Sequence, residues 1–193
     1  MIEGLLVDLV PYGTHYVDQE HTWHNSEAWF WAEAGFRPFR TKNAIRREHE
    51  AWLEQREKQP PNMIMFGIQA KDGTPLGDIA LFEMLPWHRV GMLGAAIGDP
   101  AYWGGGYGTD ALLLMVDYAF SWLDMHRLWL STMALNVRVL RQMEKVGFAP
   151  EGRRRGMWYA DGAWVDDVVY GVLREEWAGR AAMIEKLGLR AKA

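Results

Sequence analysis

A glycine-rich turn between a predicted strand and a predicted helix constrains this chain more than any other segment. The turn covers residues 98–110 and reads Gly-Asp-Pro-Ala-Tyr-Trp-Gly-Gly-Gly-Tyr-Gly-Thr-Asp. Residues 95–97 are typical of a strand, and the chain from Asp110 onward is typical of a helix. Such a turn exposes backbone N–H groups at the positive end of a helix dipole, and glycines let a ligand approach the backbone closely. The segment therefore predicts a site for a phosphate-bearing ligand.

The spacing inside this turn excludes the two commonest phosphate loops. A nucleoside-triphosphate loop has a Lys followed by Ser or Thr after its last glycine, whereas Gly108 is followed by Thr109 and Asp110. A dinucleotide-binding turn has the pattern G-x-G-x-x-G, which Gly104, Gly106 and Thr109 do not match. The phosphate-bearing ligand therefore belongs to another class.

Two segments in register carry a further pattern. Residues 102–111 read Tyr-Trp-Gly-Gly-Gly-Tyr-Gly-Thr-Asp-Ala, and residues 136–148 read Asn-Val-Arg-Val-Leu-Arg-Gln-Met-Glu-Lys-Val-Gly-Phe. They resemble the acetyl-CoA loop and the Asn-to-Gly-Phe segment of the GNAT superfamily of N-acetyltransferases. The resemblance is strongest to the branch of ribosomal-protein N-terminal (alanine/serine) acetyltransferases, with Asp110 in place of the usual glutamate. It covers about residues 5–177 and continues, in the same order and spacing, through Glu151-Gly152, Tyr159, Asp161-Gly162, Asp166 and Glu176-Trp177.

The resemblance implies a reaction and a donor. An N-acetyltransferase of this kind moves the acetyl group of acetyl-CoA, its donor substrate, to a primary amine, and in this branch to a protein or peptide N-terminus. The implied acetyl-CoA site consists of Ala96, Ile97, Gly98, Trp103, Gly104, Gly105, Gly106, Tyr107, Gly108, Thr109 and Asn136. Backbone N–H groups of residues 96–98 are expected to polarise the thioester carbonyl. Asn136 also suits the N-cap of the helix that follows it, and both roles stay open.

Two departures from the family concern proton transfer. The family often places a tyrosine acid seven residues after the asparagine and a glutamate base on the strand of residues 90–97, where this chain has Met143 and Met92. Neither methionine transfers a proton. Glu83 and His88 are therefore the candidate catalytic bases, reached through water, although each also suits a surface position. Because a peptide α-amino group loses its proton more readily than an alkyl ammonium, a site without a strong base favours a peptide N-terminus as acceptor.

A group of aromatic residues precedes the first long predicted helix. The resemblance places this segment along the acceptor cleft, whose expected residues are Trp23, Trp29, Trp31 and, from a later loop, Trp87. An aromatic slot suits a peptide end or the apolar part of an amine, and it stacks on a cation. Rings that merely cover the sheet are an equal alternative. No metal is expected, because no carboxylate or thiolate pattern accompanies His15, His21 and His24.

Hydrophobic patterning and the resemblance together predict a single α+β domain over residues 1–193. The expected GNAT-like fold has a central mixed, mostly antiparallel sheet of about six to seven strands flanked by helices. Strands are predicted at residues 5–10, 63–69, 76–84, 90–97, 126–133, 148–157 and 164–172. Helices are predicted at residues 43–58, from 110 onward, at 136–146 and, more loosely held, from 175 to about 187. The first of these helices is expected to begin at a Thr41 cap and to end before Pro60-Pro61.

Composition limits the remaining function classes. The chain of 193 residues has no cysteine, which removes disulfides, thiol nucleophiles and thiolate metal sites. Its formal net charge of -4 argues against a nucleic-acid partner, and no apolar run approaches the roughly 18 residues of a membrane span. Without a secretory signal at its start, the chain is expected in the cytoplasm, as a monomer or a homodimer. Two alternatives stay open: acetylation of a small amine (polyamine, amino sugar or amino acid), and a non-catalytic acyl-CoA-binding sensor on the same fold.

Overall fold

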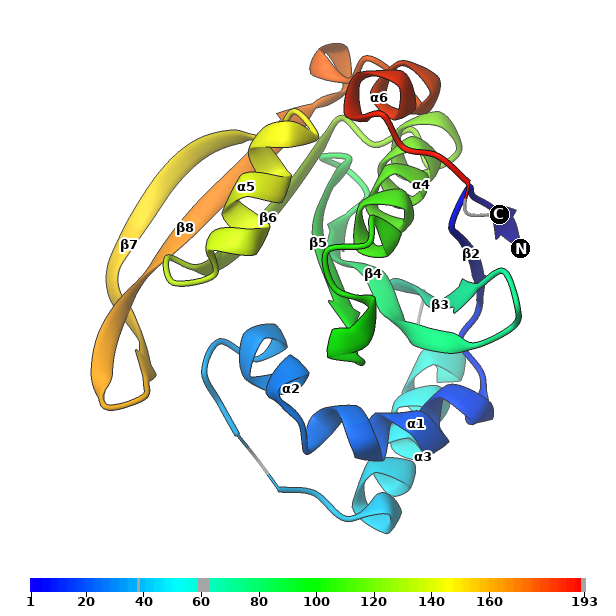
Figure 1. The fold of residues 1–193 in the computed structure, drawn as a ribbon, viewed down its shortest axis with the longest axis vertical. Helices are drawn as coiled ribbons and strands as arrows, with labels where there is room; N and C mark the ends of the chain where they lie inside the picture. Colours follow the sequence, from blue (N-terminus) through cyan, green and yellow to red (C-terminus); the bar gives the residue numbers. More distant parts are fainter. Residues whose placement is uncertain (38, 59–62, 192–193) are drawn as a thin grey trace.

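The centre of the molecule is one sheet of eight strands, in the order β1-β2-β3-β4-β5-β6-β8-β7 (Figure 1). The computed structural model describes residues 1–37, 39–58 and 63–191. The strands are β1 (Ile2–Glu3), β2 (Val7–Pro11), β3 (Ile64–Ala70), β4 (Pro75–Leu85), β5 (Val90–Ile97), β6 (Arg127–Met133), β7 (Ala149–Ala160) and β8 (Ala163–Leu173). Neighbouring strands pair antiparallel except for β5 and β6. The mixed, mostly antiparallel sheet is therefore confirmed, with the short β1 as an additional strand.

Six helices accompany this sheet in the part of the chain that the structure describes. They are α1 (Thr14–His24), α2 (Glu27–Ala32), α3 (Lys42–Lys58), α4 (Tyr107–Ser121), α5 (Val137–Lys145) and α6 (Arg180–Leu187), with 3-10 turns at Pro100–Tyr102 and Arg174–Glu176. None of the helices in these described ranges has both the length and the apolar character that crossing a lipid bilayer requires.

Helices α4 and α1 cover opposite faces of the sheet. Ile79 of β4 is buried in the same apolar cluster as the inward face of α4. The ring of Tyr16 in α1 instead packs against Gly67 of β3, whose register partner is Asp78. Because consecutive side chains of a strand point to opposite faces, Asp78 and Tyr16 share the face away from α4.

The sheet opens between β5 and β6. Their parallel register runs only from Val90 opposite Arg127 to Met92 opposite Trp129, although both strands continue further. Helices α4 and α5 lie side by side over the diverging strands (Figure 1). Residues 93–97 of β5 are therefore left without a partner strand on this edge.

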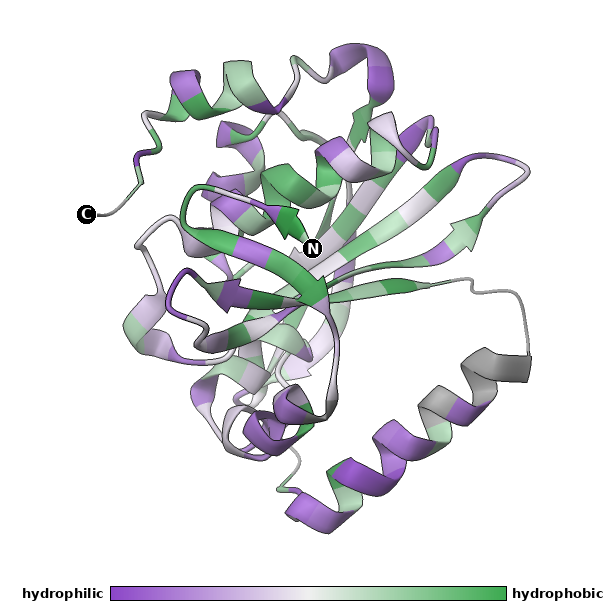
Figure 2. Cartoon of the chain, turned by 90° about the vertical axis from the view of Figure 1, so that its right-hand side faces the viewer, coloured by the Kyte–Doolittle hydropathy of each residue, from purple (hydrophilic) through white to green (hydrophobic). Residues whose placement is uncertain are grey.

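The N-terminal helices α1 and α2 are the two helices that sequence patterning does not predict. Tyr16, Val17, Trp23 and His24 of α1 are buried, at a spacing that a helix allows, but polar residues interrupt the run. The predicted helix 43–58 is present as α3, and Thr41 Oγ1 accepts the N–H of Ala44 at its start. The part of α3 that Figure 2 colours is mostly hydrophilic. Its expected end at Pro60-Pro61 lies outside the described residues.

Helix α6 is anchored on α4. Met183 is buried, and Trp177 donates its indole N–H to Asp117 at 3.3 Å. Arg180 pairs with the buried Asp110 at 3.3 Å. The sequence predicted a more loosely held helix here, because these partners lie far back along the chain and leave no local signal.

Candidate active site

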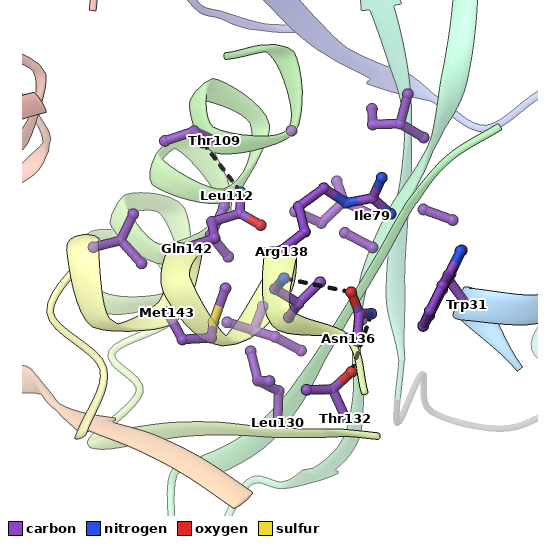
Figure 3. A pocket seen from close by; sticks show the side chains of 18 of the residues that line it. Trp31, Ile79, Thr109, Leu112, Leu130, Thr132, Asn136, Arg138, Gln142 and Met143 are labelled. Carbon is purple, nitrogen blue, oxygen red and sulfur yellow. Dashed lines mark hydrogen bonds between the residues drawn. The ribbon is translucent and has the colours of Figure 1, made fainter. Parts of the chain in front are cut away.

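A pocket of about 760 Å³ lies between α4, α5 and the edge of β5 that has no partner strand. Figure 3 shows that α5 contributes one wall and that Trp31 of α2 stands on the far side. The C-terminal residues Leu187 and Leu189 also line it. The pocket thus brings together the two segments, 102–111 and 136–148, that carry the family resemblance.

The glycine-rich turn lines one end of this pocket. Gly104 and Gly106 have φ angles of +75° and +88°, in the left-handed region that favours glycine. Gly106 is the N-cap of α4, so the N–H groups of Gly108 and Thr109 have no acceptor inside the helix. Gly104, Gly106, Gly108 and Thr109 line the pocket, whereas Gly105 and Tyr107 are not among its described lining residues.

Three basic side chains of α5 line the pocket as well. Arg138, Arg141 and Lys145 recur at positions i, i+3 and i+7, so they share one face of the helix. None of the three forms an ion pair with another residue in the described ranges. The guanidinium of Arg138 lies 3.8 Å from the centroid of the Trp103 ring. Sequence reasoning missed this cationic face, although the spacing within residues 136–148 contains it.

A second basic run, residues 153–155 of β7, is largely neutralised. Arg153 pairs with Asp166 at 2.6 Å, and Arg154 pairs with Asp167 at 2.6 Å. None of these three arginines is among the described residues that line the pocket. The cationic charge that is available to an anion in the pocket therefore lies on α5.

Asn136 stands where β6 passes into α5 and is 5% exposed. Its Oδ1 accepts the N–H of Val139 at 3.4 Å, and its Nδ2 donates to Thr132 Oγ1 at 3.3 Å (Figure 3). Asn136 and Thr132 both line the pocket. The N-cap contact is thus present, and contact of Asn136 with a ligand remains a prediction.

The end of the pocket near α2 is apolar. Its lining there includes Ala28, Trp31, Ala32, Phe82 and Met92. Met143, on the α5 side, is 2% exposed and belongs to the main apolar core. No Asp, Glu or His occurs among the described residues that line the pocket. Both positions at which the family often has a proton-transferring side chain are therefore apolar here.

The structure does not bring the two candidate bases to this pocket. Glu83 is exposed near the end of β4, with a φ of +48°, and His88 lies in the exposed turn between β4 and β5. This turn precedes β5, whereas the glycine-rich turn follows it, so the two turns lie at opposite ends of that strand. Neither side chain is among the described lining residues.

Gly98 has a packing role instead of the role that the sequence suggested. Its N–H donates to the carbonyl oxygen of Leu76 at 2.8 Å, so it is not available to a thioester carbonyl. A Cβ atom at Gly98 would lie 2.1 Å from the indole of Trp23. Trp23 is correspondingly buried against the sheet, where it covers Gly98 and does not line the pocket described here.

Of the four tryptophans expected along the acceptor cleft, Trp31 lies in the pocket. Trp29 stacks on His24 at a centroid distance of 3.4 Å, and Trp87 is 92% exposed in the turn between β4 and β5. His24 is buried, and no group of three or more potential metal ligands occurs among the described residues. Most of these rings therefore pack against the fold or face solvent.

Comparison with known proteins decides the family. Residues 9–149 match the family model of the acetyltransferase (GNAT) domain. The chain belongs to the GNAT acetyltransferase family. The membership expected from residues 102–111 and 136–148 is thereby confirmed.

Curated GNAT relatives from Bacillus subtilis (strain 168) match part of the chain. The probable N-acetyltransferase YjcK is 36% identical over 115 residues, and the putative ribosomal N-acetyltransferase YdaF is 31% identical over 116 residues. Each alignment covers 58% of this chain, with 62% of YjcK and 63% of YdaF, so it spans about three-fifths of each relative. Among solved structures, the spermidine N-acetyltransferase from Vibrio cholerae in complex with CoA and spermine has a TM-score of 0.76 at 18% identity. That match covers 89% of this chain and 97% of the other, and it shows a shared GNAT fold.

One carboxyl group beside this GNAT pocket has a shifted titration. Asp78 of β4 pairs in register with the pocket-lining Ala96, on the face that α1 covers. Burial raises the pKa of Asp78 to about 7, and the nearby carboxylates of Glu20 and Glu33 add to the shift. Sequence reasoning did not single out Asp78, because its shift depends on α1 and α2 packing above it.

Proposed function

We propose that this protein transfers the acetyl group of acetyl-CoA to the α-amino group of a peptide or protein N-terminus. The observation that carries the choice of acceptor is the lining of the pocket, which has no Asp, Glu or His among its described residues. An α-amino group has a pKa of about 8, so roughly a tenth is neutral near pH 7. An alkyl ammonium, with a pKa of about 10.4, is neutral in less than about one part in a thousand. A pocket without a proton acceptor therefore suits the α-amino group better.

The residues at the glycine-rich end fit the phosphates of acetyl-CoA. The N–H groups of Gly108 and Thr109, at the start of α4, suit the diphosphate. Arg138, Arg141 and Lys145 supply positive charge, and none of the three forms an ion pair with a described acidic residue. The ligand's diphosphate and 3′-phosphate are the matching negative groups.

The free edge of β5 is the proposed place for the reacting thioester. The N–H of Gly98 points to β4, so the alternation of the strand turns the N–H groups of Ala95 and Ile97 toward the pocket. We assign these two groups as donors to the carbonyl oxygen, on which negative charge develops. The thioester of acetyl-CoA supplies the activated acetyl group.

Proton transfer in this proposal involves solvent. The amine nitrogen forms a bond to the acetyl carbon, and the carbon–sulfur bond breaks. Water accepts the amine proton, because the lining offers no basic carboxylate or imidazole. The departing thiolate takes its proton from water as well, because Met143 occupies the position at which the family often has an acid.

The test is a panel of acceptors at pH 7.5, with kcat/KM measured by release of CoA. One set consists of peptides with a free Ala or Ser N-terminus. The matched set has the same sequences with a blocked N-terminus and a free lysine side chain, and spermidine is included as a polyamine. We expect the free N-terminus to be preferred. Preference for spermidine or for the lysine side chain would overturn the assignment. Calorimetric binding of acetyl-CoA without turnover of any amine would instead support the sensor alternative.

A further inference from the structure

The C-terminal end of the described chain returns to the glycine-rich turn. Leu187 and Leu189 line the same pocket as Gly106 and Arg141. A Cβ atom at Gly106 would lie 3.2 Å from Leu189 Cδ2, so the leucine side chain rests against the glycine. Both leucines are half-buried, with one side packed on the main core. They therefore present apolar surface at the end of the pocket where the phosphates are expected.

The end of α6 has the geometry that directs Leu189 to this position. Gly188 ends the helix in the left-handed conformation, with a φ of +62°. The N–H of Leu189 donates to the carbonyl oxygen of Ile184 at 3.1 Å, and that of Gly188 donates to Glu185 at 3.1 Å. These are the two hydrogen bonds of a Schellman motif, which reverses the chain and brings an apolar residue back toward the helix.

A buried ion pair fixes the start of α6. The side chain of Asp110, in the first turn of α4, is 0% exposed and pairs with Arg180 at 3.3 Å. The second carboxylate oxygen accepts the N–H groups of Leu6 at 2.7 Å and Val7 at 3.2 Å. Asp117, further along α4, accepts the backbone N–H of Arg180 at 3.4 Å. The position of α6 is therefore tied to the helix whose first turn begins at the glycine-rich turn.

We propose that residues 180–189, here called the tail, form part of the acetyl-CoA site and hold the adenosine end of the ligand. Leu187 and Leu189 are its apolar wall, and Arg180 is a positioning residue. The inference rests on the proposed use of acetyl-CoA and is independent of the acceptor. From the proposed diphosphate site, β5 runs toward Met92 and the apolar end of the pocket. We therefore place the pantetheine arm, which carries the acetyl group, along β5. The leucines stand beside Gly106, so the flat, weakly polar adenine is the part of the ligand that they match.

The first experiment removes one leucine side chain. Isothermal titration calorimetry compares Leu189→Ala with the parent, using acetyl-CoA and S-acetyl-4′-phosphopantetheine, which lacks the adenosine together with its 3′- and 5′-phosphates. We expect the Kd for acetyl-CoA to rise about tenfold, from the loss of part of the apolar surface buried against leucine. The Kd for the shorter ligand is expected to stay unchanged. Glu175→Gln, at an exposed position before the tail, is the control and is expected to leave both affinities unaltered.

The second experiment tests the positioning role. Arg180→Leu removes the positive charge that pairs with Asp110 and is expected to raise the Kd for acetyl-CoA. Arg180→Lys keeps the charge and is expected to retain most of the parent's affinity. Circular dichroism establishes that the variants are folded.

An unchanged Kd for acetyl-CoA in Leu189→Ala, or equal losses for both ligands, overturns the adenosine assignment. Failure of the parent protein to bind either ligand would instead reject the proposed function.

Discussion

Asp78 is held in its protonated form almost to neutral pH. Burial disfavours its charge, and the carboxylates of Glu20 and Glu33 act in the same direction, so the pKa rises from 3.8 to about 7 on folding. Between these two values the native state binds a proton that the unfolded state has lost. The contribution of Asp78 to the free energy of unfolding is therefore fully present below about pH 4. It decreases as the pH rises to about 7 and does not change further above that pH.

We expect Asp78→Asn to remove this pH dependence. In urea unfolding, the variant should be more stable than the parent at pH 8, by about 4 kcal/mol, and should show no gain at pH 4. Glu83→Gln, at an exposed position, is the control and should behave like the parent at both pH values. A gain of equal size at both pH values would contradict the shifted pKa.

In the proposed mechanism, Asp78→Asn, Glu83→Gln and His88→Ala also leave the pH–rate profile of peptide acetylation unchanged.

At the scale of one element, the first turn of α4 allows binding to be separated from folding. A Cβ atom at Gly108 would lie 3.5 Å from Ile97 and 3.9 Å from Gln142, which are ordinary contacts. Gly106 is less suitable, because its φ of +88° strains any other residue and a Cβ would lie 3.0 Å from Leu6. Position 108 therefore accepts a side chain that position 106 does not.

We expect Gly108→Asp to raise the Kd for acetyl-CoA at least about a hundredfold, because its carboxylate repels the diphosphate. Stability should be kept or slightly raised, since a negative charge in the first turn of a helix interacts favourably with the helix dipole. Calorimetry and thermal unfolding measure the two effects. Gly108→Ala is the neutral control and should retain most of the affinity. Affinity like that of the parent in the aspartate variant would reject the assignment of this turn to the phosphates.

Elements with strong local signals could be predicted from the sequence, and those that depend on distant contacts could not. Asp161-Gly162 is a pair typical of a hairpin turn, and both residues have positive φ between β7 and β8. In the sequence, Gly98 resembles the loop glycines that follow it. In the structure, a glycine is required there because the indole of Trp23 from α1 fills the space that a side chain would occupy. The helical spacing of the basic residues on α5 could have predicted their shared face. The contact of Leu189 with Gly106 could not be predicted, because no local pattern links these two distant residues.

At the scale of the whole molecule, Asp110 joins three parts of the chain. Its buried carboxylate, in the first turn of α4, contacts the backbone at the start of β2 and the side chain of Arg180 at the start of α6. We expect Asp110→Asn to lower the free energy of unfolding by about 2–4 kcal/mol, because it leaves Arg180 without its partner. In a double-mutant cycle measured by urea unfolding, Arg180→Leu should recover part of that loss. A loss below about 0.5 kcal/mol in the single variant would show that the ion pair does not hold these segments together.

The contacts of Asp110 also form in the order in which their residues are translated. Leu6 and Val7 leave the ribosome first, but their acceptor arrives only with Asp110, and Asp110 receives its cation only with Arg180. Domains generally fold as units during synthesis, so this domain is incomplete while residues that form its contacts are still missing. Here the last helix of the described chain supplies the final contact beneath the glycine-rich turn. A chain that is still being translated is therefore expected to lack a finished ligand site until residues 180–189 have been added.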